Sequence, residues 1–179
     1  MRLKSLIKIF VVKDSQIYML EDKFIDIIDD VDKLNKNYIK TLKIKNIELK
    51  QCYTFIKKGK ISVDVTVMYV DIVNYTDLSK DYELLKLGKD ECSKKGMEYI
   101  RSILGHFNTL KKIYPNTFSI PEVQKLFENT YNIKYDRRNF RKRLLVSKCV
   151  KELDIYGKYG KGRPAKMYEF IGDMDKEVV

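Results

Sequence analysis

The side chains best placed to do chemistry are cations that cluster near the end of the chain. Residues 132–170 include twelve basic and four acidic residues, which is +8 of the formal net charge of +11. Five of the seven arginines lie between Arg137 and Arg163. The planar guanidinium group pairs with phosphates and with guanine edges through two hydrogen bonds, which lysine cannot do. The segment therefore predicts a polyanionic partner, with nucleic acid as the first candidate, and fits a merely solvated lysine-rich surface poorly.

Two short helices are predicted to carry these cations. Ser119-Ile120-Pro121-Glu122 is typical of a capping box with proline in the first turn, so a helix should begin there and end near Thr130. Asp136 is a good N-cap for a second helix, in which Phe140 and Leu144 should face inward. The second helix then has the pattern of a DNA recognition helix, whose first turns enter the major groove. Its candidate DNA contacts are Arg137, Arg138, Asn139, Arg141 and Lys142.

Two residues of that helix, Asn139 and Arg143, have other possible roles. Asn139 could read adenine or could help to close the start of the helix. Arg143 is expected to lie toward the side of the helix in a structural role.

A basic hairpin is predicted to follow the second helix. Residues 149–155 and 165–171 are predicted strands, and the loop between them has three glycines and three cations. Its segment Lys161-Gly162-Arg163-Pro164 resembles the core of an AT-hook, in which glycine and proline let an arginine lie in a narrow minor groove. Two helices followed by a basic hairpin describe a winged helix-turn-helix. Its predicted DNA contacts are Lys161, Arg163 and Lys166.

The first 90 residues are predicted to form a strand-rich α+β domain. Hairpins are expected over residues 3–20, with a turn at Asp14-Ser15, and over residues 48–69. Residues 24–34 have the spacing of an amphipathic helix. From Met97 to Ile113 apolar residues recur at i, i+3, i+4 and i+7, which predicts one long connecting helix.

The composition excludes several other classes of protein. No apolar run approaches the 18 or so residues that cross a bilayer, so we expect a cytoplasmic protein without a membrane partner. Cys52, Cys92 and Cys149 lack the C-x-x-C spacing of a zinc site and are expected to be reduced packing residues. His106, the single histidine, has no neighbouring ligand in the sequence. We therefore expect neither a metal nor a cofactor.

The C-terminal motifs also resemble a known family. The resemblance is carried by FSIPEVQKLFE at 118–128, DRRNFRKRL at 136–144 and GRPAKMYEF at 162–170. In order and spacing they are similar to the winged helix of Nudix-related transcriptional regulators of the NrtR type, from about Leu110 to Ile171. Residues 47–71 are similar to a hairpin in the middle of the family's N-terminal domain. The resemblance implies a Nudix-like domain that senses a nucleotide such as ADP-ribose, a homodimer, and an operator in double-stranded DNA.

The chain departs from this family where a Nudix hydrolase holds its metal. The hydrolase needs a glycine-led loop and a helix with R-E-x-x-E-E, because clustered glutamates bind the divalent cation against a diphosphate. Between Leu20 and Ile47 the chain has no glycine, no arginine and one glutamate, Glu21. In this stretch Asp26 shares a predicted helix face with Asp30, and Asp29 with Asp32. These four aspartates could in principle hold a cation, but they are expected to form the solvated side of the helix.

The sequence thus predicts a sequence-specific DNA-binding transcriptional regulator, expected to be a repressor, with a non-catalytic Nudix-like domain. Its expected fold is α+β: a shortened Nudix-like mixed-sheet domain over residues 1–90, a connecting helix over 91–115 and a winged helix-turn-helix over 116–173. One alternative is a Nudix-type nucleoside diphosphate hydrolase, for which the metal ligands are missing. The other is an RNA-binding or protein-binding module without operator specificity, for which stacking aromatic motifs are not evident near the cations.

Overall fold

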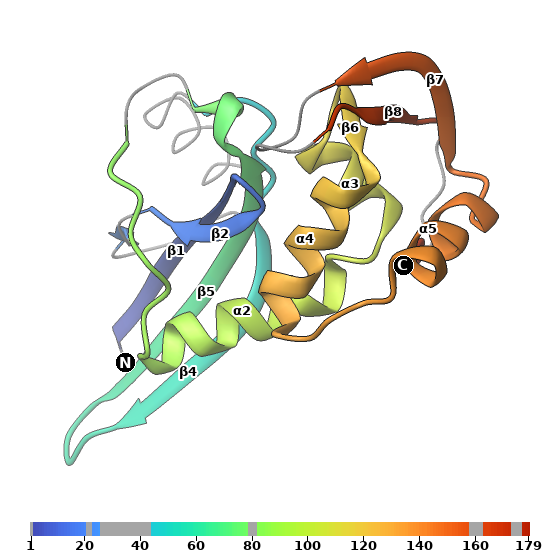
Figure 1. Ribbon diagram of the computed structural model, residues 1–179. Helices are drawn as coiled ribbons and strands as arrows, with labels where there is room; N and C mark the ends of the chain where they lie inside the picture. The colour runs from blue at the N-terminus through green and yellow to red at the C-terminus, as the bar shows by residue number, and fades with distance from the viewer. Residues whose placement is uncertain (1, 21–22, 26–43, 79–81, 158–162, 173–176) are drawn as a thin grey trace. The chain divides into compact units, whose positions relative to one another are not determined.

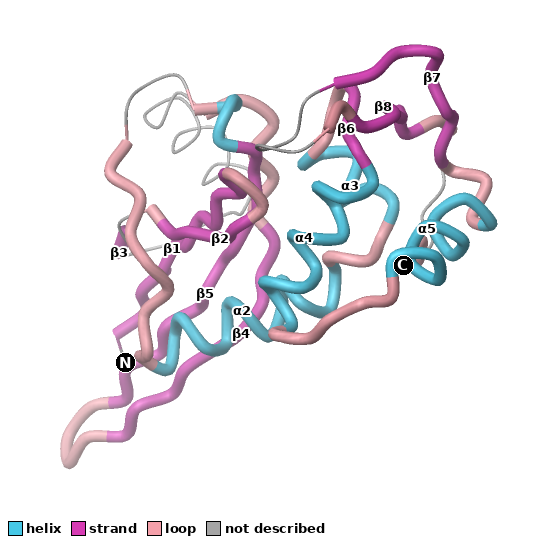
Figure 2. Tube along the Cα trace, viewed as in Figure 1, coloured by secondary structure: helices cyan, strands magenta, loops and turns pink. Residues whose placement is uncertain are grey.

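The computed structural model describes every residue except 1, 21–22, 26–43, 79–81, 158–162 and 173–176 (Figure 1). The chain divides into two compact units, one of residues 1–13 and 17–100, the other of residues 14–16 and 101–179. Figure 2 shows that strands dominate the first unit and helices the second. The elements in chain order are β1 (Arg2–Lys13), β2 (Gln16–Met19), β3 (Lys23–Ile25), β4 (Lys50–Lys58), β5 (Val63–Asn74), η1 (Tyr75–Asp77), α2 (Glu91–Ile103), α3 (Phe107–Ile113), β6 (Thr117–Ser119), α4 (Ile120–Tyr131), α5 (Arg137–Val146), β7 (Val150–Gly157) and β8 (Ala165–Phe170).

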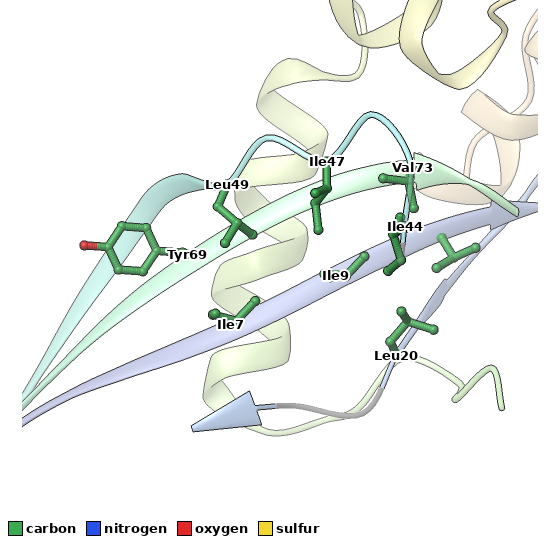
Figure 3. Close-up of a cluster of buried hydrophobic side chains, with 9 residues drawn as sticks. Ile7, Ile9, Leu20, Ile44, Ile47, Leu49, Tyr69 and Val73 are labelled. Atoms are coloured by element: carbon green, nitrogen blue, oxygen red, sulfur yellow. The ribbon is translucent and has the colours of Figure 1, made fainter. Parts of the chain in front are cut away.

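The first unit is built on a mixed sheet. Its strand order is β2-β1-β5-β4, and β3 also pairs with β1. The central strands β1 and β5 are parallel, with Leu6 opposite Met68, whereas β4 pairs with β5 in the antiparallel direction. Nearly continuous apolar runs in β1 and β5 are typical of strands that are covered on both faces. One buried cluster is made of Ile7, Ile9, Val11, Leu20, Ile44, Ile47, Leu49, Tyr69 and Val73 (Figure 3).

Helix α2 packs against side chains of β1 through a small residue and a buried cation. A Cβ atom at Gly96 would lie 2.7 Å from the ring of Phe10, so any other residue there would force that buried ring to move. Lys8 is 1% exposed, and its Nζ donates a hydrogen bond of 3.3 Å to Ser93 Oγ. The Ser93 hydroxyl in turn donates to Asp90, and this hydrogen bond is the main cause of the lowered pKa of the Asp90 carboxyl. A buried ammonium group requires such polar partners, and they tie β1 to the start of α2.

Both predicted hairpins of the N-terminal part are confirmed. In the first, Asp14 and Ser15 have φ values of 49° and 58°, which suit a tight turn between β1 and β2. The second corresponds to β4 and β5. The helix predicted over residues 24–34 is wrong at its start, because Lys23–Ile25 pairs with β1 as a strand. Its remainder lies outside the described residues.

The prediction of one helix from Met97 to Ile113 is also wrong. Helix α2 ends at Ile103 and α3 begins at Phe107. The interruption lies at Gly105, whose low helix propensity is combined with a carbonyl that accepts the Val178 N–H at 2.8 Å. The apolar period continues through the break because α3 also buries one face, so periodicity alone could not reveal it.

The second unit has the architecture of a winged helix. Helices α3, α4 and α5 accompany an antiparallel sheet of order β6-β8-β7. The predicted helices after Ser119 and Asp136 and the two predicted strands of the hairpin are confirmed. Strand β6 was not predicted, because three residues next to a helix cap are too few to show a period of two. None of the described helices is long and apolar enough to span a membrane.

Aromatic rings fix α5 against α4. Phe140 of α5 is 1% exposed. It packs edge-on against Phe127 of α4, with 5.6 Å between ring centroids, and against Tyr135 at 5.4 Å. Leu144, one turn later, is fully buried. These contacts set the orientation of α5 because the other side chains of that helix are exposed or only partly buried.

Phe140→Ala should therefore destabilise the second unit by about 3 to 5 kcal/mol, because it removes a buried ring and leaves a cavity. Chemical denaturation of the full chain, followed by circular dichroism, would measure the change. Arg138→Ala, an exposed position on the same helix, is the control and should change stability by less than about 0.5 kcal/mol. Equal effects of the two substitutions would contradict the central place of Phe140.

Candidate nucleic-acid interface

Helix α5 begins with a cap and then presents cations. Asp136 Oδ1 accepts the Asn139 N–H at 2.9 Å, which confirms the predicted N-cap. With Phe140 and Leu144 turned inward, the five predicted contact residues of the helix are all exposed: Arg137, Arg138, Asn139, Arg141 and Lys142. Cations near a helix N-terminus are disfavoured by the helix dipole, so their position there does not serve helix stability. It is the position from which a recognition helix contacts DNA.

The capping box of α4 is present in a weak form. The Glu122 carboxylate accepts the Ser119 N–H at 3.5 Å. The buried Ser119 Oγ makes no hydrogen bond of normal geometry with the described residues. Burial is the main cause of a raised pKa at Glu122. The start of α4 therefore depends on Pro121 and on packing as much as on the predicted reciprocal bonds.

The wing strands bring two further predicted residues to this region. Tyr156 of β7 lies opposite Lys166 of β8 in the antiparallel pair. Lys166 Nζ donates to Asp154 Oδ1 at 3.0 Å and lies 5.0 Å from the centroid of the Tyr156 ring. Arg163 is exposed and lies two residues before the start of β8. Lys161 lies outside the described residues.

A groove of about 790 Å³ lies between α4, the start of α5 and β8. The structure brings four of the predicted contact residues to it: Arg137, Arg141, Arg163 and Lys166. Two further cations, Lys125 of α4 and Lys134 of the α4–α5 connection, also line the groove. Sequence reasoning missed both, because they precede the arginine-rich helix and reach the groove only through the packing of α4 on α5.

Among the described lining residues, the acidic one is Glu128. Its side chain is 12% exposed. It accepts hydrogen bonds from Gln124 Nε2 at 3.1 Å, from the Tyr135 N–H at 3.2 Å and from Lys134 Nζ at 3.3 Å. The bond from Gln124 is the main cause of the lowered pKa of Glu128. The charged carboxylate thereby holds the connection between the two helices in place.

A second acid, Glu152 of β7, contacts residues of the same groove. Its Oε2 accepts a hydrogen bond of 3.4 Å from Arg141 Nη2 and one of 2.8 Å from the Tyr168 hydroxyl. Its Oε1 lies 3.7 Å from Lys166 Nζ. Burial, followed by the bond to Glu152, raises the pKa of Tyr168. The sequence pattern assigned no role to Glu152, because its partners come from α5 and from β8.

The described residues offer little for metal or thiol chemistry. No group of three or more His, Cys, Asp or Glu side chains in the described part of the chain could hold a metal ion. The aspartates at 26, 29, 30 and 32 lie outside that part. None of the three cysteines forms a disulfide. Burial raises the pKa of the Cys52 thiol to about 12, as expected of a packing residue rather than a nucleophile.

Comparisons with known proteins agree with this geometry. Residues 111–170 match the family model of the NrtR DNA-binding winged helix domain. No curated protein sequence matches the chain.

Solved structures of similar fold cover nearly the whole chain. The structure of Shewanella oneidensis NrtR complexed with a 27mer DNA has a TM-score of 0.72 and 16% identity, over 94% of this chain and 93% of that chain. S. oneidensis NrtR in a second structure has a TM-score of 0.66 and 16% identity, over 94% of each chain. A MutT/nudix family protein from Enterococcus faecalis has a TM-score of 0.62 and 16% identity, over 96% of this chain and 88% of that chain.

These matches confirm the predicted resemblance and the predicted α+β fold, a Nudix-like mixed-sheet part followed by a winged helix of the NrtR type. At this level of identity the solved structures establish the fold, and the family model establishes the winged helix.

Glu128→Gln tests whether the carboxylate stabilises the groove through its charge. Folding lowers the pKa of Glu128 below the ordinary value of 4.5, so its contribution to stability is present above that pH and is lost as the pH falls through the lowered value. At pH 7 the variant should be less stable than the wild type by up to about 1 kcal/mol, and the two should converge in more acidic solution. Urea denaturation over a pH series would measure this, and a difference independent of pH would contradict it.

Proposed function

We propose that this chain, with an NrtR-type winged helix after a Nudix-like part, is a sequence-specific DNA-binding transcriptional regulator that represses its targets. The observation that carries the proposal is the exposed group of cations in the first two turns of α5, where the helix dipole disfavours them. Such a placement is explained by an anionic partner. The proposal is also supported by the solved structure of S. oneidensis NrtR with a 27mer DNA.

Each predicted contact residue has a proposed role. Arg137, Arg138, Arg141 and Lys142 would contact bases or phosphates in the major groove. Asn139 donates its backbone N–H to Asp136, and its exposed side chain would read adenine. Arg163 with Lys161 would enter the adjacent minor groove, and Lys166 would bind the backbone between the two.

The proposed assembly is a cytoplasmic homodimer. A dimer with paired recognition helices reads two half-sites of a palindrome, so we expect a palindromic operator. Residues 1–90 would form the dimer and residues 116–173 would bind the DNA, joined by residues 91–115.

The Nudix-like part is proposed to be a non-catalytic sensor. The glutamates that would hold a divalent cation against a diphosphate are missing from the sequence between Leu20 and Ile47. The fold it shares with a MutT/nudix family protein supports a nucleotide effector such as ADP-ribose. Effector binding would then change operator affinity without turnover.

Selection from a random-sequence duplex pool tests the DNA-binding proposal. The wild type should enrich a palindromic motif, and Arg137→Ala/Arg141→Ala should lose it, because each base-reading arginine contributes about 1 to 3 kcal/mol of discrimination. The slope of log affinity against log salt should also become shallower by about 0.9 for each phosphate contact that is lost.

Arg101→Ala is a suitable control, because that arginine donates to the Thr130 carbonyl within the second unit and does not line the groove. The control should enrich the same motif as the wild type. The proposal would be contradicted if the affinity fell equally with salt for every duplex sequence. It would also be contradicted by a preference for single-stranded RNA of equal charge.

A second experiment tests the silent sensor. Incubation of the protein with ADP-ribose and Mg²⁺ or Mn²⁺ should give no hydrolysis, whereas ADP-ribose in a titration should weaken the complex with the enriched duplex by about 5- to 150-fold at saturation, the usual range of allosteric coupling. Hydrolysis that a chelator abolishes would show an active enzyme. Operator affinity that ADP-ribose leaves unchanged would exclude this effector.

A further inference from the structure

An acidic side chain, Glu152, lies within the basic surface that we propose contacts DNA. Its carboxylate contacts Arg141 at 3.4 Å and Lys166 at 3.7 Å, and both cations line the groove. A carboxylate in this position repels the phosphates of any DNA that approaches those cations. Its presence there therefore requires an explanation, and the following inference rests on the proposed function.

Stability does not supply that explanation. The side chain of Glu152 is 45% exposed and that of Arg141 is 55% exposed. Exposed ion pairs contribute little to stability. Glu152 also lies on β7, at the edge of the sheet of order β6-β8-β7 formed by the described residues, rather than in a core position.

The carboxylate is nevertheless held in a defined place. Tyr168 lies opposite Glu152 in the pairing of β7 with β8. It is 2% exposed, and its hydroxyl donates to Glu152 Oε2 at 2.8 Å. The same oxygen accepts from Arg141. A buried, rigid ring thus anchors the acid, and the acid in turn anchors an arginine of the recognition helix.

We propose that Glu152 is a positioning residue that sets sequence specificity. It takes the place of a DNA phosphate for Arg141 while the protein is free, and it shares Lys166 with Asp154, whose Oδ1 accepts a hydrogen bond of 3.0 Å from that ammonium group. On DNA of arbitrary sequence, a phosphate can bind Arg141 only by displacing the Glu152 carboxylate. That carboxylate remains nearby and repels the phosphate. On the operator, Arg141 keeps the orientation given by Glu152 and extends its remaining donors to a base edge. Specificity then arises because binding to the wrong sequence is weakened.

The test uses the full chain and two duplexes, one enriched by the wild type from the random pool and one of equal length from the unselected pool. Glu152→Gln should raise the affinity for the unselected duplex about tenfold, and for the enriched duplex by no more than about twofold. The reason is that like-charge repulsion weakens binding to phosphates more than binding to base edges. The ratio of the two affinities should therefore fall by at least about fivefold. Equal changes for the two duplexes would overturn the inference.

Glu169→Gln is the matched control. It makes the same change of charge on the neighbouring strand β8, where Glu169 pairs with Lys151 at 3.2 Å and does not line the groove. It should raise both affinities by the same factor and leave their ratio unchanged. A fall in the ratio equal to that of Glu152→Gln would show an effect of net charge alone and would overturn the inference.

Two further variants separate positioning from a general structural role. In the Arg141→Ala background, Glu152→Gln should no longer change the ratio, because the residue through which it acts is gone. Tyr168→Phe keeps the acid but removes its anchor, and should lower the ratio even if Glu152→Gln does not fold. An unchanged ratio in Tyr168→Phe, or a full effect without Arg141, would refute the role of Glu152. A wild type that does not discriminate between the duplexes would instead refute the proposed function, and with it any specificity for Glu152 to set.

Discussion

The burial of Phe140 between Phe127 and Tyr135 is the contact on which the candidate interface depends. Helix α5 has ten residues, of which only Phe140 and Leu144 are buried. An isolated helix of this length is marginal in water. Helix α5 therefore depends on the packing of these two side chains and on the cap at Asp136. The residues between the cap and Leu144, apart from Phe140, contribute charge or polarity rather than apolar surface. Because only these two side chains face inward, the other faces of α5 are available for cations.

Two acids lie among those cations, and they contribute in different ways. A concentration of like charge weakens the compact state through self-repulsion, which the charged Glu128 reduces. Glu128 and Glu152 each accept hydrogen bonds from several donors, but the donors belong to different parts of the second unit. Glu128 binds groups of α4 and of the helix connection, which makes it part of the frame. Glu152 binds Arg141 of α5, which makes it part of the proposed readout. The two glutamates thus have different roles, because different elements supply their hydrogen-bond donors.

Local signals in the sequence predicted much of this arrangement, and tertiary contacts account for what was missed. The cap at Asp136, the spacing of Phe140 and Leu144 and the β-hairpins are encoded within a few residues, so they could be inferred directly. The break at Gly105 could not, because it depends on pairing with Val178, far along the chain. The same holds for the burial of Lys8 by α2 and for the convergence of Lys125 and Lys134 on the groove. Residues that act through distant partners leave no periodic signal.

The fold of the first unit also shows why a Nudix-like sheet can persist without the sequence of a hydrolase. Its described core comes from β1, β5 and the segments that cover them, where apolar residues of suitable size are sufficient. The glutamates of a metal site are charged and contribute little to such a core. Their absence between Leu20 and Ile47 of the sequence is therefore compatible with the packing of the described sheet. A TM-score of 0.72 at 16% identity is consistent with this separation, in which the fold is kept by burial and the function depends on a few side chains at its surface.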